Sequence, residues 1–164
     1  NVSGNTCADH DWLLDLYALV GNKRELASRL IVEITETAAI HDLDQSIVFV
    51  DTLKEMGCRV AIDDFGAGYT SFKNLKHLPV DIVKIDGAFV RNLATDASDR
   101  LFLRTMVELA RNFEMDTVAE WVIDEDTARI AAETGNDYLQ GFHLGRPVDP
   151  EQLCGRGDEQ DSGA

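Results

Sequence analysis

The stretch VAIDDFGAGYTSF, residues 60–72, joins a strand to a glycine loop through two acids. It begins as an apolar, β-branched run, which predicts a buried strand. The run ends in the adjacent carboxylates Asp63 and Asp64, and glycines at 66 and 68 follow at once. Neighbouring carboxylates repel each other, so this arrangement at a strand end calls for a positive partner.

Similar apolar runs recur on both sides of this stretch, with helical patterns between them. We expect strands at 29–35, 58–63, 81–86, 115–120 and 136–142. Apolar residues at three- and four-residue intervals predict helices at 11–20, 42–57, 98–113 and 124–135, and a short helix at 71–78. Asp96 or Ser98 is expected to cap the longest helix.

Strands that alternate with helices at this spacing predict a parallel sheet with crossover helices. A (β/α)8 barrel and an open doubly wound sheet both fit this order. The dinucleotide-binding form of the open sheet loses support, because no Gly-x-Gly-x-x-Gly follows a strand. The segment GAGYTS lacks the third glycine and has no long helix directly after it.

The composition limits the range of partners. The chain has 164 residues, enough for one domain with its own core. Its net charge of −15 argues against binding to DNA or RNA polymers and against an anionic membrane surface. The sequence shows no membrane segment and no signal-peptide pattern. Its three cysteines, Cys7, Cys58 and Cys154, match no zinc or disulfide spacing, so we expect free thiols in a cytoplasmic protein.

Each expected strand becomes polar at its carboxyl end. A single acid there would be an ordinary strand terminus or helix cap, but five strands in succession follow the pattern. Because carboxyl ends of parallel strands meet at one edge, we expect these side chains to converge. Alternation along the strands places Asp63 on the face of Ala61, and Lys84 on that of Ile82. The polar residues are Glu33, Asp63, Asp64, Lys84, Asp86, Glu120 and Gln140.

Several carboxylates in one pocket require neutralising cations. All-oxygen ligands favour Mg²⁺ or Mn²⁺, with Ca²⁺ as a non-productive competitor. Two adjacent acids can share two such ions, an arrangement that clamps phosphoryl oxygens and activates a water. Lys84 would orient hydroxide or stabilise developing charge. The histidines do not cluster, so a histidine-based site has no support: they are His10, His41, His77 and His143.

Five motifs together resemble the EAL family of bacterial cyclic-di-GMP phosphodiesterases. They are EITE at 33–36, DDFGAGYTSF at 63–72, VKID at 83–86, AEWV at 119–122 and QGFHLGRP at 140–147. The resemblance implies a (β/α)8 TIM-barrel-like EAL domain over residues 1–153. It also implies hydrolysis of cyclic-di-GMP to linear pGpG with two Mg²⁺ or Mn²⁺ ions, and inhibition by Ca²⁺. The small, polar and acidic residues 154–164 predict a disordered tail.

The resemblance also implies a role for each matching residue. Lys84 resembles the lysine that contacts the nucleophilic water, and Glu120 and Gln140 match members of the metal and water shell. Glu36 matches the glutamate that anchors the glycine loop after the paired aspartates. The residues that resemble metal ligands are Asn1, Glu33, Asp63, which is shared by both ions, Asp64 and Glu120.

This sequence departs from the family pattern in three places. The glutamate of the Glu-Ala-Leu motif and the arginine after it are absent, so we expect a barrel lacking its first strand or strands and a chain that is one part of a longer protein. Where the family usually has Glu-Gly-Val-Glu, this chain has Glu120-Trp121-Val122-Ile123. The resemblance further implies a homodimer, and a sensor or GGDEF-type domain upstream.

Two alternatives compete with a metal-dependent phosphodiesterase. One is a catalytically impaired cyclic-di-GMP-binding sensor or interaction module, motivated by Ile123 and the absent first glutamate. The other is Schiff-base chemistry at Lys84. That chemistry needs a lowered lysine pKa, whereas a ring of acids raises it.

Overall fold

The computed structural model describes residues 1–67 and 75–149. Within them, five parallel strands form one sheet in the order β1-β2-β3-β4-β5. All five expected strands are present, and the fifth is shorter than the expected 136–142. The strands are β1 (Ile31–Thr35), β2 (Arg59–Phe65), β3 (Ile82–Ile85), β4 (Asp116–Ala119) and β5 (Tyr138–Leu139).

Four helices match the expected ones: α2 (His10–Val20), α5 (Leu43–Glu55), α7 (Ala97–Asn112) and α8 (Glu125–Thr134). Asp96 caps α7, since its carboxylate accepts from the backbone N–H of Ser98 and Asp99. Three further helices were not expected, because segments of four to six residues show no periodicity: α1 (Gly4–Cys7), α3 (Arg24–Ala27) and α4 (Glu36–His41). None of the described helices is long and apolar enough to cross a membrane.

Some expectations fall on residues that the structure leaves undescribed. The first half of the expected helix at 71–78 lies there, as do Gly68, Cys154 and the expected tail at 154–164. The other two cysteines, Cys7 and Cys58, are buried free thiols, as expected. Burial raises the pKa of both thiols.

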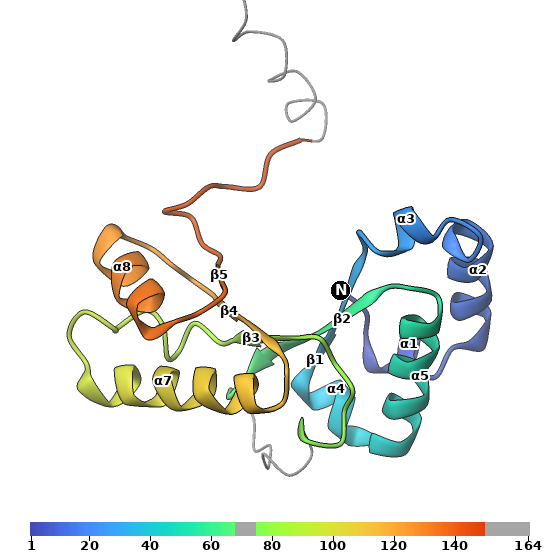
Figure 1. Cartoon of the computed structure of the whole chain (residues 1–164), viewed down its shortest axis with the longest axis horizontal. Helices are drawn as coiled ribbons and strands as arrows, with labels where there is room; N and C mark the ends of the chain where they lie inside the picture. Colours follow the sequence, from blue (N-terminus) through green and yellow to red (C-terminus); the bar gives the residue numbers. More distant parts are fainter. Residues whose placement is uncertain (68–74, 150–164) are drawn as a thin grey trace, which may run out of the picture.

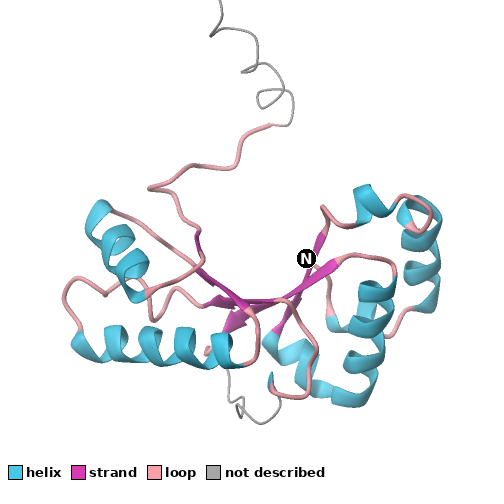
Figure 2. Cartoon of the chain, viewed as in Figure 1, coloured by secondary structure: helices cyan, strands magenta, loops and turns pink. Residues whose placement is uncertain are grey.

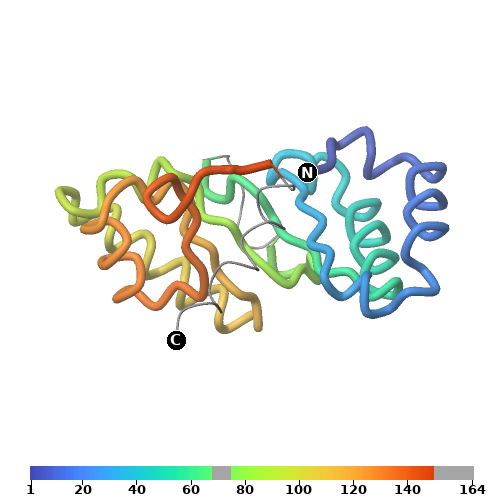
Figure 3. Tube along the Cα trace, turned by 90° about the horizontal axis from the view of Figure 1, so that it is seen from above, coloured from blue at the N-terminus to red at the C-terminus, as the bar shows by residue number. Residues whose placement is uncertain are grey.

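The strand order distinguishes between the two parallel architectures. A doubly wound sheet reverses its order at a switch point. Here each strand pairs with its neighbour in sequence, so right-handed crossovers place the helices on one side of the sheet. Figure 1 shows how these helices follow the strand order, with α1 to α5 beside β1 and β2 and with α7 and α8 beside β4 and β5; Figures 2 and 3 show the same two groups of helices. The described residues therefore form a sector of a (β/α)8 barrel.

The two faces of the sheet differ in character. The outer face is apolar and is buried beneath the helices. Its residues are Ile34, Val60, Ile62, Val83, Ile85 and Ala119. The alternate residues form the inner face, which lines a cavity of about 340 Å³. Glu33, Ala61, Lys84 and Gln140 lie on this cavity. The polar strand ends are thus on the inner face of the barrel sector.

Candidate metal centre

Lys84 on β3 joins the polar ends of three other strands. Its Nζ lies 2.7 Å from Asp63 Oδ1 of β2, and 2.8 Å from an oxygen of Glu120, directly after β4. A third carboxylate, Glu33 of β1, lies 3.2 Å away. The Lys84 side chain is only 6% exposed. The predicted convergence of these four residues is confirmed.

The surroundings keep Lys84 charged. Burial alone lowers the pKa of the ammonium, but hydrogen bonds to Asp63 and Glu120 outweigh burial and raise the pKa above its ordinary value. A lysine that forms a Schiff base must lose its proton first. The environment of Lys84 therefore argues against Schiff-base chemistry and favours a fixed cation.

A β-bulge explains how two adjacent acids reach the same side of the sheet. Strict alternation would send Asp63 and Asp64 to opposite faces. Instead the pairing of β2 with β3 shifts by one residue between Ile62 and Phe65. Asp64 has a φ of 55°, in the left-handed region that aspartate enters more readily than most residues. The extra residue turns the Asp64 carboxylate back towards that of Asp63.

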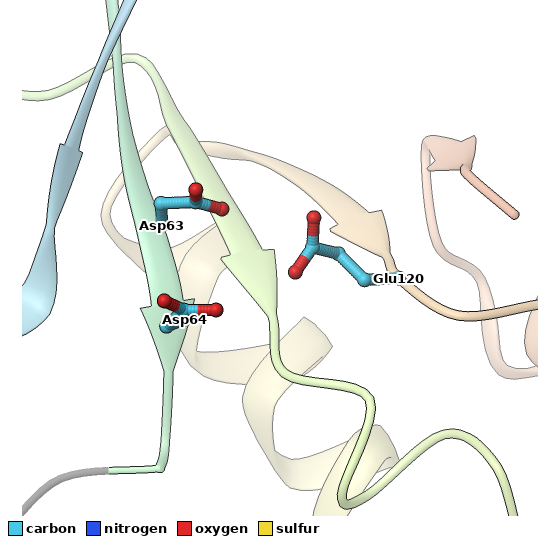
Figure 4. Close-up of side chains that lie close together, drawn as sticks. All are labelled: Asp63, Asp64 and Glu120. Atoms are coloured by element: carbon cyan, nitrogen blue, oxygen red, sulfur yellow. The ribbon is translucent and has the colours of Figure 1, made fainter. Parts of the chain in front are cut away.

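The bulge completes a cluster of three carboxylates. One oxygen from each of Asp63, Asp64 and Glu120 lies within 4.8 Å of the others. Figure 4 shows the three carboxylates close together. Burial raises the pKa of Asp64, and the charges of Asp63 and Asp86 raise it further, against the opposing effect of Lys84. Such a cluster of hard oxygen donors with surplus negative charge fits a divalent cation such as Mg²⁺ or Mn²⁺.

The other predicted site residues lie at different distances from this cluster. Gln140 Nε2 is 3.5 Å from Glu120 Oε1, so it borders the cluster. The N–H of Val2 donates to the carbonyl of Glu33, and Val2 pairs in parallel with Ile34. This register places Asn1 level with Glu33.

Glu36 has a different position from the metal-ligand candidates. It is buried at the start of α4, and its Oε2 accepts a hydrogen bond of 2.7 Å from the Gly66 N–H. It therefore holds the beginning of the loop that follows the paired aspartates, while residues 68–74 of that loop lie outside the described part.

Sequence reasoning placed Asp86 at a strand end but did not include it among the site residues. The structure brings it close enough to raise the pKa of Asp64. Its Oδ1 also accepts from the Ala88 N–H. Its position at the end of β3, two residues after Lys84, was the available signal.

Three comparisons with known proteins place these features in a wider context. The family model of the EAL domain matches residues 1–147. Cyclic di-GMP phosphodiesterase PdeF of Escherichia coli K12 is 35% identical over 147 residues, which are 90% of this chain and 20% of PdeF.

Solved structures share the fold. The PaMucR phosphodiesterase in its c-di-GMP complex, from the MucR protein of Pseudomonas aeruginosa, has a TM-score of 0.85 at 37% identity, over 93% of this chain and 62% of that one. BlrP1 of Klebsiella pneumoniae, in a complex with calcium and cy-diGMP, has a TM-score of 0.78 at 26% identity, over 87% of this chain and 36% of that one. This chain thus spans about a fifth of the length of PdeF and less than two thirds of either solved chain.

Proposed function

This chain belongs to the EAL domain family, and from that premise we propose that its domain hydrolyses cyclic-di-GMP to linear pGpG. The observation that carries the proposal is the cluster of Asp63, Asp64 and Glu120 beside the buried Lys84. A structural ion pair needs one carboxylate for one ammonium, and this site has several. The surplus acids are suited to metal ions that act on a phosphodiester.

We assign the metal ions to the clustered carboxylates. Asp63, Asp64 and Glu120 would hold Mg²⁺ or Mn²⁺. We propose Glu33 and Asn1 as further ligands, since Glu33 also contacts Lys84 and Asn1 lies level with Glu33. Two such ions, when bound, would polarise the phosphoryl oxygens and activate a water. Ca²⁺ accepts more ligands in looser geometry, which is the physical basis for expecting it to inhibit.

The chain's own residues orient the reaction. In the overall change, water adds to one phosphorus and the P–O3′ bond breaks, which leaves a 5′-phosphate on pGpG. The charged Lys84 can donate to the attacking oxygen or to a phosphoryl oxygen and stabilise negative charge there. Gln140, beside Glu120, offers an amide to the same region. Glu36 keeps the loop after Asp64 anchored at Gly66.

The decisive experiment follows turnover in the full-length protein. With cyclic-di-GMP and Mn²⁺ it is expected to release pGpG, detected by anion-exchange chromatography. A chelator should stop the release, added Mn²⁺ should restore it, and Ca²⁺ should suppress it. Asp63→Asn is expected to lower kcat by about 10³-fold or more, because it removes a central carboxylate of the proposed metal centre. Unchanged turnover in this variant, with an unchanged melting temperature, would contradict the assigned roles.

The binding-module alternative makes a different prediction for the same experiment. It requires tight binding of cyclic-di-GMP and no pGpG after prolonged incubation with Mn²⁺. The structure gives little support to the idea that Ile123 impairs catalysis, since Ile123 is 51% exposed and lies outside the carboxylate cluster. The homodimer, the upstream domain and the cytoplasmic location stay predictions of the family resemblance and the composition.

A further inference from the structure

A second cavity adjoins the metal centre where the chain leaves β4 and β5. Its volume is about 490 Å³, a size that suits a nucleobase. Glu120 and Gln140 line it together with the aromatic residues Trp121 and Phe142 and the cation Arg146. Because Glu120 belongs to both the cavity and the carboxylate cluster, a ligand of the metal centre would extend directly into this space.

Trp121 occupies an unusual backbone position in this cavity. Its φ is 55°, in the left-handed region that a bulky side chain rarely enters. The family resemblance has glycine at this position, which adopts such a φ without strain. A strained residue persists only where its surroundings fix it, and such residues concentrate at ligand sites. The backbone therefore points to a use for the indole ring.

The surroundings of Trp121 cover only part of its side chain. The Arg91 guanidinium lies over the indole at 3.9 Å from its centroid. Gly87 lies so close to Trp121 that a Cβ there would collide with the indole. Even with these contacts, Trp121 is 51% exposed and lines the cavity. The indole is thus in contact with a cation and keeps an exposed part that a ligand in the cavity can reach.

A second aromatic–cation pair lines the same cavity. The Arg146 guanidinium lies 4.9 Å from the centroid of the Phe142 ring, and Phe142 is itself exposed. Aromatic rings stack on the faces of nucleobases, and guanidinium groups can donate to their oxygen and nitrogen acceptors. Two such pairs beside a metal centre form a site for a planar, acceptor-rich ring attached to a phosphodiester.

We infer that the exposed part of the Trp121 ring stacks on one guanine base of cyclic-di-GMP, so that Trp121 determines substrate affinity in this chain. The inference rests on the proposed function, because the phosphodiester must lie at Asp63, Asp64 and Glu120 for a base to enter the cavity. Stacking also provides attraction that does not depend on charge, which matters beside a cluster of carboxylates that repels phosphate.

The test compares Trp121→Gly and Trp121→Phe in the full-length protein. Glycine adopts the φ of this position, so Trp121→Gly removes the ring while keeping the backbone. It is expected to raise KM for cyclic-di-GMP, and Kd measured by calorimetry with Ca²⁺, by about 5- to 100-fold. Trp121→Phe should recover most of the affinity, because it retains an aromatic face. The matched control is Leu144→Ala, since Leu144 is 53% exposed nearby but does not line the cavity.

A second measurement separates stacking from support of the metal centre. Mn²⁺ affinity without nucleotide should stay near the wild-type value in Trp121→Gly. An equal loss of Mn²⁺ and nucleotide affinity, or no change in KM and Kd, would overturn the inference. Wild-type protein that binds cyclic-di-GMP without releasing pGpG would contradict hydrolysis. The Kd values of the wild type and the two Trp121 variants would still show whether the ring stacks on a base. Wild-type protein that binds no cyclic-di-GMP would overturn both.

Discussion

The inner face of the sheet has an ion pair near each end, and the two differ in charge balance. Towards the amino ends of the strands, Arg59 of β2 pairs with Asp116 of β4, one cation with one carboxylate. These side chains are 35% and 41% exposed. At the carboxyl ends, the buried Lys84 contacts Glu33, Asp63 and Glu120, and Asp64 adds a further carboxylate to the cluster.

This difference separates a structural contact from a binding site. The Arg59–Asp116 pair is neutral as a unit and needs no further partner. The Lys84 cluster has several carboxylates for one ammonium, and its repulsion is relieved only by protons or by added cations. The same sheet thus has a charge-balanced ion pair at one end and a cluster with excess negative charge at the other.

The largest expected difference in stability appears when the cation is removed at one end or at the other. Lys84→Met should destabilise the metal-free protein by about 3–5 kcal/mol, because it leaves buried carboxylates without their partner. Arg59→Met should cost about 1 kcal/mol or less, since its pair is partly solvated. Urea unfolding with a chelator measures both. Saturating Mn²⁺ should recover part of the loss only for Lys84→Met, and equal losses in the two variants would show that the ends do not differ.

An intermediate effect of opposite sign is expected from neutralising one acid at each end. Asp64→Asn should stabilise the metal-free protein by about 0.5 kcal/mol, because it removes surplus charge and asparagine tolerates the left-handed φ of this position. It should also weaken Mn²⁺ binding about tenfold or more. The matched variant Asp116→Asn should lower stability, since it breaks a balanced pair. Unfolding curves measure the changes in stability, and calorimetric titration measures the change in Mn²⁺ affinity. A loss of stability in Asp64→Asn would contradict an excess of negative charge at the carboxylate cluster.

The smallest effect is expected outside both ends, at Ile123. Ile123→Glu restores the residue that the family usually has, but the side chain is half exposed and lies outside the carboxylate cluster. Turnover with Mn²⁺ should therefore change by less than about threefold. Ile123→Gln separates the effect of charge from that of size. A tenfold gain specific to glutamate would mean that this position reaches the metal centre after all.

Sequence reasoning predicted the strands and the shared face of their polar ends. The apolar runs and two-residue alternation were enough to place Asp63 and Lys84 on one side of the sheet. Alternation fails at Asp64, because the bulge depends on how β2 pairs with β3, and that pairing is tertiary. The proximity of Asp64 to Asp63 therefore could not be derived from the β2 segment alone.

Other features escaped prediction because they are short or non-local. Helix α4 spans six residues, fewer than two turns, so no periodicity marks it. The departure at Trp121 was visible in the sequence, but its left-handed backbone and its contact with Arg91 were not. Those features depend on how the chain after β3 meets the chain after β4.

The sequential order of the sheet also has a consequence for folding. Among the five strands, each pairs only with its neighbours in sequence, so the described sheet can grow one βα unit at a time through local contacts. The metal centre is the exception, because Asp63 and Glu120 come from β2 and the end of β4, with β3 between them. Loss of pairing at any of these three strands disperses the ligands. The proposed Mn²⁺ binding would therefore report in a single measurement whether these three consecutive strands are paired.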